Sequence, residues 1–88
     1  MNILLALFTA ANALAAYHYI EVDGSINPGS SNYIVENIAR AETAGADGLI
    51  LRINTPGGLL SSTRDIIQGI NQSKVPVIVH VGPGGASA

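Results

Sequence analysis

Two glycine-rich segments carry the residue types best suited to chemistry in this chain of 88 residues. The first is Thr55-Pro56-Gly57-Gly58, and the second runs from Gly82 to Ala88. Glycine permits unusual backbone angles and close approach of a ligand. Backbone N–H groups in such segments can hold a phosphate or the developing charge of an acyl-transfer intermediate. A simple tight turn is the third interpretation, and the residues alone leave all three open.

The other polar residues give weaker signals. His18 and His80 lie on predicted strands without a carboxylate at ligand spacing, so we interpret them as ordinary strand residues. Ser62 and Asp65 form an S-x-x-D pattern, which predicts a helix cap rather than a catalytic group. Ser87 stands apart because it follows a Gly-Gly-Ala turn, where a nucleophile would be exposed. The chain has no cysteine, which excludes a disulfide framework and a thiolate zinc site, and we predict neither a metal nor a cofactor.

Alternating strand and helix patterns must position these segments. Strands are predicted over Tyr17–Val22, Gly48–Asn54 and Val75–Val81. The first helix begins at Asn27-Pro28, where asparagine is the N-cap and proline takes the first helical position, and it ends at Gly45. The second helix is predicted from an apolar stripe formed by Leu59, Thr63, Ile66, Ile67 and Ile70.

The β-α-β-α-β order predicts an α/β fold with a parallel sheet and right-handed crossovers. The second and third strands are nearly continuous apolar runs, which is typical of a sheet covered by helices on both faces. Functional segments of open parallel sheets lie at the carboxyl ends of the strands. Both glycine-rich segments follow a strand there, so we expect them to lie close together.

The first 16 residues have the pattern of a secretory signal peptide. Ile3–Phe8 is an apolar core too short to span a bilayer as a stable helix. Ala13-Leu14-Ala15 fits a small-x-small cleavage site, so we expect cleavage after Ala15 or Ala16. A buried core helix or an uncleaved anchor is the alternative. Residues 17–88 would then form one incomplete domain, because about 70 residues bury too little surface for comfortable stability.

Composition excludes two further classes of protein. Charged residues make up 11% and hydrophobic residues 48% of the chain, which is too apolar for a disordered segment. The net charge is −2, and the charges are scattered without the basic stripe that a nucleic-acid backbone requires.

Residues from Tyr19 to Ala88 resemble the long-form NfeD proteins, which are membrane-bound serine proteases of the ClpP class. The resemblance is carried by EVDGSINPGSSNYI, by GADGLILRINTPGGLLSSTRDIIQGI and by SKVPVIVHVGPGGASA. The Pro-Gly-Gly step alone is shared with ClpP and signal-peptide peptidase A, so it identifies the superfamily better than the family.

The resemblance implies a ClpP/crotonase-like β-α spiral and a catalytic dyad of serine and lysine. Gly57 and Gly58 match the glycine pair that flanks the oxyanion and the substrate strand, and Gly58 is the favoured donor. On this alignment the nucleophile falls just beyond Ala88, and the lysine lies further downstream, because Lys74 is misplaced for that role. A second register makes Ser87 itself the nucleophile.

The activity implied is that of a membrane-associated, exported serine endopeptidase on the extracytoplasmic side. Its implied partners are a polypeptide substrate, a stomatin-like membrane protein and further copies of itself. The 88 residues alone are expected to be inactive. Two alternatives remain open at this point: a crotonase-type module that binds acyl-CoA or phosphate, and a catalytically inactive ClpP-like scaffold.

Overall fold

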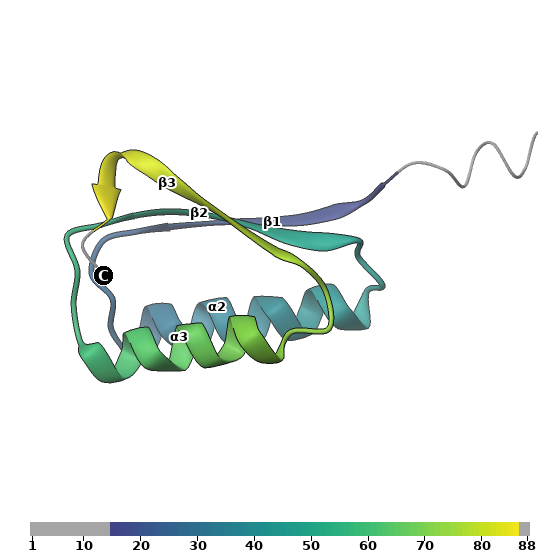
Figure 1. Ribbon diagram of the computed structural model, residues 1–88, viewed down its shortest axis with the longest axis horizontal. Coiled ribbons are helices and arrows are strands. Elements are labelled where there is room, and N and C mark those ends of the chain that lie inside the picture. Colours follow the sequence, from purple (N-terminus) through teal and green to yellow (C-terminus); the bar gives the residue numbers. More distant parts are fainter. Residues whose placement is uncertain (1–14, 87–88) are drawn as a thin grey trace, which may run out of the picture.

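The computed structural model of the protein describes residues 15–86. Its elements, in chain order, are β1 (Tyr17–Asp23), α2 (Pro28–Thr43), β2 (Gly48–Thr55), α3 (Leu60–Gln72) and β3 (Val77–Ala86) (Figure 1). The three strands form one sheet in the order β1-β2-β3, and both neighbouring pairs are parallel. The predicted α/β fold with a parallel sheet is therefore confirmed.

The ends of α2 follow the sequence prediction. Asn27 caps the helix with a capping box, in which its Oδ1 accepts from the Ser30 N–H at 3.0 Å and its N–H donates to Ser30 Oγ at 2.9 Å. At the other end Gly45 takes a φ of 67°, and the Ala46 N–H donates to the Ala41 carbonyl at 3.0 Å. Such a left-handed glycine satisfies carbonyls that the last turn leaves free.

Both helices pack on the same face of the sheet, so within the described residues the apolar second and third strands are covered by helices on one face only (Figure 1). The reason is topological. The strand order advances in one direction, and two right-handed crossovers made in the same direction place their helices on the same side. The resulting core lies between the helices and the sheet and contains Ile20, Val22, Ile26, Ile34, Ile38, Ala41, Leu49, Leu51, Ile53 and Ile66.

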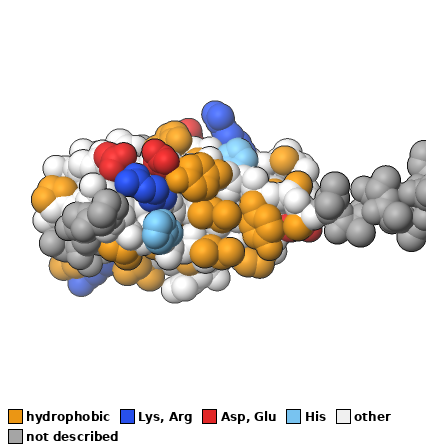
Figure 2. Space-filling model, turned by 90° about the horizontal axis from the view of Figure 1, so that it is seen from above, with side chains coloured by type: hydrophobic (Ala, Val, Ile, Leu, Met, Phe, Trp, Pro, Cys, Tyr) orange, Lys and Arg blue, Asp and Glu red, His pale blue; other side chains and the backbone are white. Residues whose placement is uncertain are grey.

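The opposite face of the sheet is open and partly apolar. Tyr19 and Ile78 are 53% and 48% exposed. They belong to one cross-strand row, because both are in register with Ile50 of β2. Figure 2 looks onto this face and shows hydrophobic side chains gathered beside a group of charged ones. Arg52 of β2 forms an ion pair with the end of β1, where its Nη1 lies 3.6 Å from Asp23 Oδ1.

The second helix differs from its prediction. It begins at Leu60 with Leu59 as the N-cap, and no side chain caps it. Ser62 is buried inside the first turn, so the predicted S-x-x-D cap is wrong. Of the predicted apolar stripe Ile66 is buried, whereas Leu59 and Ile67 are about half exposed. The stripe is wider than the face that α2 and the sheet can cover.

The third strand also departs from expectation. It runs on to Ala86, although the sequence predicts its end at Val81 and a loop thereafter. Thr55 of β2 pairs with Ala86, after a register shift between Ile53 and Thr55. β2 continues past Ile53, the residue opposite Val81. It therefore offers backbone hydrogen-bond partners to the glycine-rich segment that follows Val81.

Candidate active site

Three segments of the chain meet at the carboxyl end of the sheet. β2 ends at Thr55, and β3 continues beside it. The turn after β1 is tied to β2 by a hydrogen bond of 3.0 Å from the Gly24 N–H to the Asn54 carbonyl. Thr55 of the first glycine-rich segment pairs with Ala86 of the second, and a Cβ at Gly82 would lie 2.9 Å from the Cβ of Asn54, the residue before Thr55. The expectation that they lie together is confirmed.

Ile26 anchors the first glycine-rich segment. Its N–H donates to the Gly57 carbonyl at 2.9 Å, and its carbonyl accepts from the Leu59 N–H at 2.9 Å. These two bonds make a parallel bridge between Ile26 and Gly58. In such a bridge the central residue turns its own N–H and carbonyl to the opposite side. The Gly58 N–H therefore points away from Ile26.

Gly58 must be glycine because the two backbones touch. A Cβ at this position would lie 1.9 Å from the Ile26 carbonyl oxygen, which is well inside any real contact. The side chain of Ile26 is 1% exposed, so the bridge is fixed to the core. Sequence reasoning missed Ile26. The available signal was a lone apolar residue within the polar turn Ser25-Ile26-Asn27.

Gly57 uses its own backbone groups to hold the turn. Its φ is 112°, in the region that favours glycine. Its N–H donates to Thr55 Oγ1 at 3.1 Å, and the Thr55 hydroxyl lies 3.3 Å from the Gly57 carbonyl as a donor. The Gly58 N–H, by contrast, meets no acceptor among residues 15–82, and Gly58 is exposed. Of the pair, Gly58 is the one whose N–H has no acceptor among these residues.

The histidines and the upstream lysine do not join this site. The His18 Nε2 lies 3.0 Å from Asn37 Oδ1, under the sheet against α2. His80 is exposed on β3 and in register with Arg52. Lys74 sits just before β3, at the other end of that strand. Within residues 15–86 there is no group of three His, Cys, Asp or Glu side chains that could hold a metal ion.

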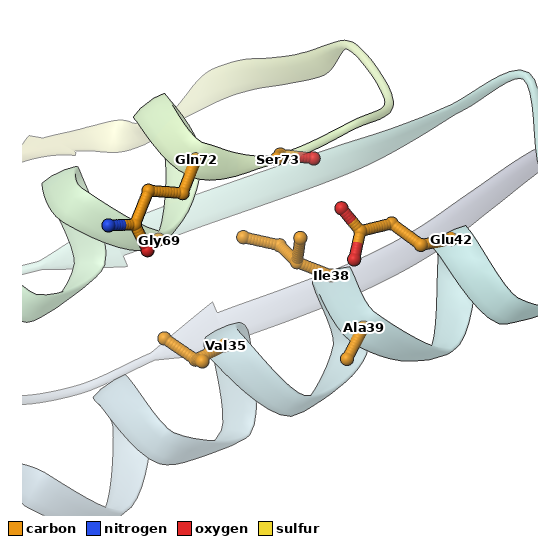
Figure 3. Close-up of a pocket in the computed structure, with 7 residues that line it drawn as sticks. All are labelled: Val35, Ile38, Ala39, Glu42, Gly69, Gln72 and Ser73. Atoms are coloured by element: carbon orange, nitrogen blue, oxygen red, sulfur yellow. The ribbon is translucent and has the colours of Figure 1, made fainter.

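A shallow cavity of about 180 Å³ lies elsewhere, along the seam of the two helices (Figure 3). Gly69 permits this close packing, because a Cβ there would lie 3.1 Å from Val35 Cγ2. The cavity is lined by Val35, Ile38, Ala39, Glu42, Gly69, Gln72 and Ser73. None of these residues belongs to the glycine-rich segments, so the cavity is separate from the candidate active site.

Comparison with known protein families assigns the chain to a family. A family model described as the N-terminal domain of NfeD1b matches residues 16–88. The chain belongs to the NfeD1b family. The family resemblance deduced from the sequence is thereby confirmed, and the match covers the whole sheet, both helices and both glycine-rich segments.

Two curated relatives of this NfeD1b domain are much longer proteins. The membrane-bound protease PH1510 of Pyrococcus horikoshii is 33% identical over 90 residues, which cover 100% of this chain and 20% of that protein. The membrane protein NfeD1b of Bacillus subtilis is 35% identical over 71 residues, which cover 81% of this chain and 16% of that protein. The chain thus spans a fifth or less of the length of these relatives.

Solved structures confirm the ClpP-like fold. A serine-to-alanine mutant of the membrane-bound stomatin-specific protease 1510-N matches with a TM-score of 0.78 and 34% identity, over 84% of this chain and 36% of that one. A lysine-to-alanine mutant in complex with a substrate peptide matches with a TM-score of 0.76 and 32% identity, over 81% and 32% of the two chains. The 1510-N protease from Pyrococcus horikoshii, specific for a stomatin homologue, matches with a TM-score of 0.76 and 32% identity, over 86% and 39%.

Some sequence predictions fall outside the described residues. Ser87 and the greater part of the signal peptide lie there, so these remain predictions. The relatives are named as membrane proteins. In the part of the NfeD1b domain that the structure describes, neither helix has the length and apolar character needed to cross a bilayer.

Proposed function

We propose that this domain supplies the oxyanion donor of a serine endopeptidase, and that the donor is the Gly58 N–H. The observation that carries the proposal is the bridge to Ile26, which directs this N–H away from Ile26 at a residue that is exposed. The N–H of Gly57 donates to Thr55 Oγ1, so of the two glycines only Gly58 is proposed as the oxyanion donor. A donor held by core packing meets the requirement for stabilising charge without reorganisation during the reaction.

The nucleophile is proposed to be a serine just beyond Ala88, with a lysine further along as general base. The serine oxygen attacks the carbonyl carbon of the scissile peptide, and the lysine removes the serine proton. The carbonyl oxygen becomes an oxyanion and accepts a hydrogen bond from Gly58. Solved relatives with a serine or a lysine replaced by alanine support this pair of groups. The second register, with Ser87 as nucleophile, is the alternative.

The proposed substrate is a membrane-associated or exported polypeptide, with a stomatin-like membrane protein as the first candidate. The support comes from the relatives named as stomatin-specific proteases, one of them bound to a substrate peptide. An extracytoplasmic location and a homo-oligomeric state of the full-length protein complete the proposal.

The most direct test removes the N–H group of Gly58 and leaves the backbone conformation unchanged. Replacing Gly58 by glycolic acid in the full-length protein changes the backbone N–H to an ester oxygen, without adding the Cβ that would strike Ile26. Loss of one oxyanion donor lowers kcat by about 10²–10³-fold. The measurement is cleavage of a peptide taken from a stomatin-like protein of the same organism, with an unchanged thermal unfolding curve as the check on folding.

The matched control is the same ester substitution at Gly45. That N–H lies after α2, at the opposite end of the sheet, and it donates to the Glu42 carbonyl at 3.1 Å, so this ester also shows how much a lost backbone hydrogen bond by itself affects kcat. We expect kcat to stay at the parent value there. Equal kcat for the Gly58 ester and the parent protein would refute the donor assignment.

A further inference from the structure

Among the described residues, Ala16 is held by Asp47, which lies directly before β2. Its N–H donates to Asp47 Oδ2 at 2.7 Å, and its carbonyl accepts from the Asp47 N–H at 2.8 Å. The next residue, Tyr17, already pairs with Gly48 in the parallel ladder. Asp47 therefore holds the chain directly before β1.

The same residue follows the predicted cleavage site. Ala13-Leu14-Ala15 supplies small residues at the two positions that a signal peptidase recognises, which predicts hydrolysis of the bond between Ala15 and Ala16. One water is consumed, and the products are a carboxylate on Ala15 and a free amine on Ala16, which is protonated at neutral pH. The family model also begins its match at residue 16.

We propose that Asp47 is the acceptor for the amino terminus created by signal-peptide removal, and that cleavage occurs after Ala15. The nitrogen that donates to Asp47 in the continuous chain becomes an ammonium group in the processed one. It keeps its place and gains a positive charge opposite a carboxylate at 2.7 Å. A charge-assisted hydrogen bond replaces a neutral one, and processing strengthens the attachment of β1 to β2.

The geometry also chooses between the two cleavage positions that the sequence leaves open. Cleavage after Ala16 would remove both hydrogen bonds to Asp47 and start the chain at Tyr17. Cleavage after Ala15 keeps both. Ala16 and Asp47 are exposed, so we expect a small effect, of the size of a surface ion pair. The inference rests on the signal peptide and is independent of the proposed protease activity.

The first experiment identifies the amino terminus. The full-length protein is expressed with its leader, purified from the membrane fraction and analysed by mass spectrometry of the amino-terminal peptide. We expect a chain that starts at Ala16. A start at Met1 or at Tyr17 would overturn the proposal.

The second experiment measures the ion pair. Full-length protein is prepared with its first residue at Ala16 or, one residue longer, at Ala15, each with Asp47 or with Asp47→Asn. Hydrogen exchange of the β1 amides reports the opening of the strand. In the Ala16 form we expect Asp47→Asn to raise the opening equilibrium about threefold, as for an exposed ion pair. In the Ala15 form the charge is displaced and the increase should be under about 1.5-fold.

The matched control is Asp65→Asn, which removes the same charge from an exposed position on α3. It should leave β1 exchange unchanged in both forms. The effect of Asp47→Asn should also shrink in about 1 M salt, where the Debye length is about 3 Å. Equal effects of Asp47→Asn in the Ala16 and Ala15 forms would overturn the proposal, because the free amine would then contribute nothing.

Discussion

The two glycine-rich segments have similar compositions and different structural roles. The first, Thr55 to Gly58, is held by the bridge to Ile26 and by the Thr55 hydroxyl, and its Gly58 N–H points away from Ile26. The second, Gly82 to Ala86, continues β3 as a strand and pairs with the end of β2. Glycine is needed for a backbone contact and an unusual φ in the first segment, and for close approach to Asn54 in the second. Segments of similar composition thus form a tight turn in one place and a strand in the other.

The largest effect should come from Gly58→Val. A Cβ at this position meets the Ile26 carbonyl oxygen at 1.9 Å, so the bridge between the two residues must open. We expect a loss of at least about 3 kcal/mol in the free energy of unfolding, at the upper end of overpacking effects. Thermal or denaturant unfolding of the full-length protein measures it. A stability equal to that of the parent protein would show that the first segment is not held as described.

The contact between Gly58 and Ile26 also affects how the activity of Gly58→Val is interpreted. A side chain at Gly58 collides with Ile26 rather than with a bound substrate, so lost activity in Gly58→Val would report structure. The ester substitution described above separates the two causes.

Gly57→Ala should have the next largest effect. Its φ of 112° is strained for any residue with a Cβ. We expect about 2 kcal/mol of destabilisation from backbone strain. The measurement is again unfolding of the full-length protein, and a neutral or stabilising outcome would contradict the backbone conformation of this turn.

A smaller effect is expected for Gly82→Ala in the second segment. The new Cβ would lie 2.9 Å from Asn54 Cβ, and the strands must separate slightly to admit it. We expect about 1 kcal/mol of destabilisation. The variant Asn54→Gly in the Gly82→Ala background should restore part of the loss. An absence of any rescue would show that the two segments do not press on each other there.

The smallest effect is expected for Ser87→Ala in the full-length protein. Labelling with a fluorophosphonate should stay at the parent level, with the label on a serine beyond Ala88. Mass spectrometry of the labelled peptide locates it. Labelling at Ser87, or its disappearance in Ser87→Ala, would favour the second register and make the end of the second segment the nucleophile turn.

Much of the fold is predictable because its signals are local. The cap at Asn27 and the left-handed Gly45 depend on residues within a turn of each other, and both ends of α2 are correct. The incorrect predictions concern features that depend on tertiary packing. The cap of α3, its exposed Leu59 and Ile67, and the continuation of β3 past Val81 depend on which surfaces and strands lie beside them.

The sequence by itself determined the order of strands and helices, the family, and the position of both glycine-rich segments at the carboxyl ends of strands. Spacing, turn residues and motif carry that information along the chain. Only the tertiary structure decided that both helices share one face, that Ile26 reaches across to Gly58, and that Asp47 meets Ala16. The two contacts join residues that are about 30 positions apart in the chain. The shared face of the helices depends on the handedness of the crossovers. Hydrogen bonds between backbones leave no mark on side-chain pattern, and so the direction of the Gly58 N–H could come only from the folded chain.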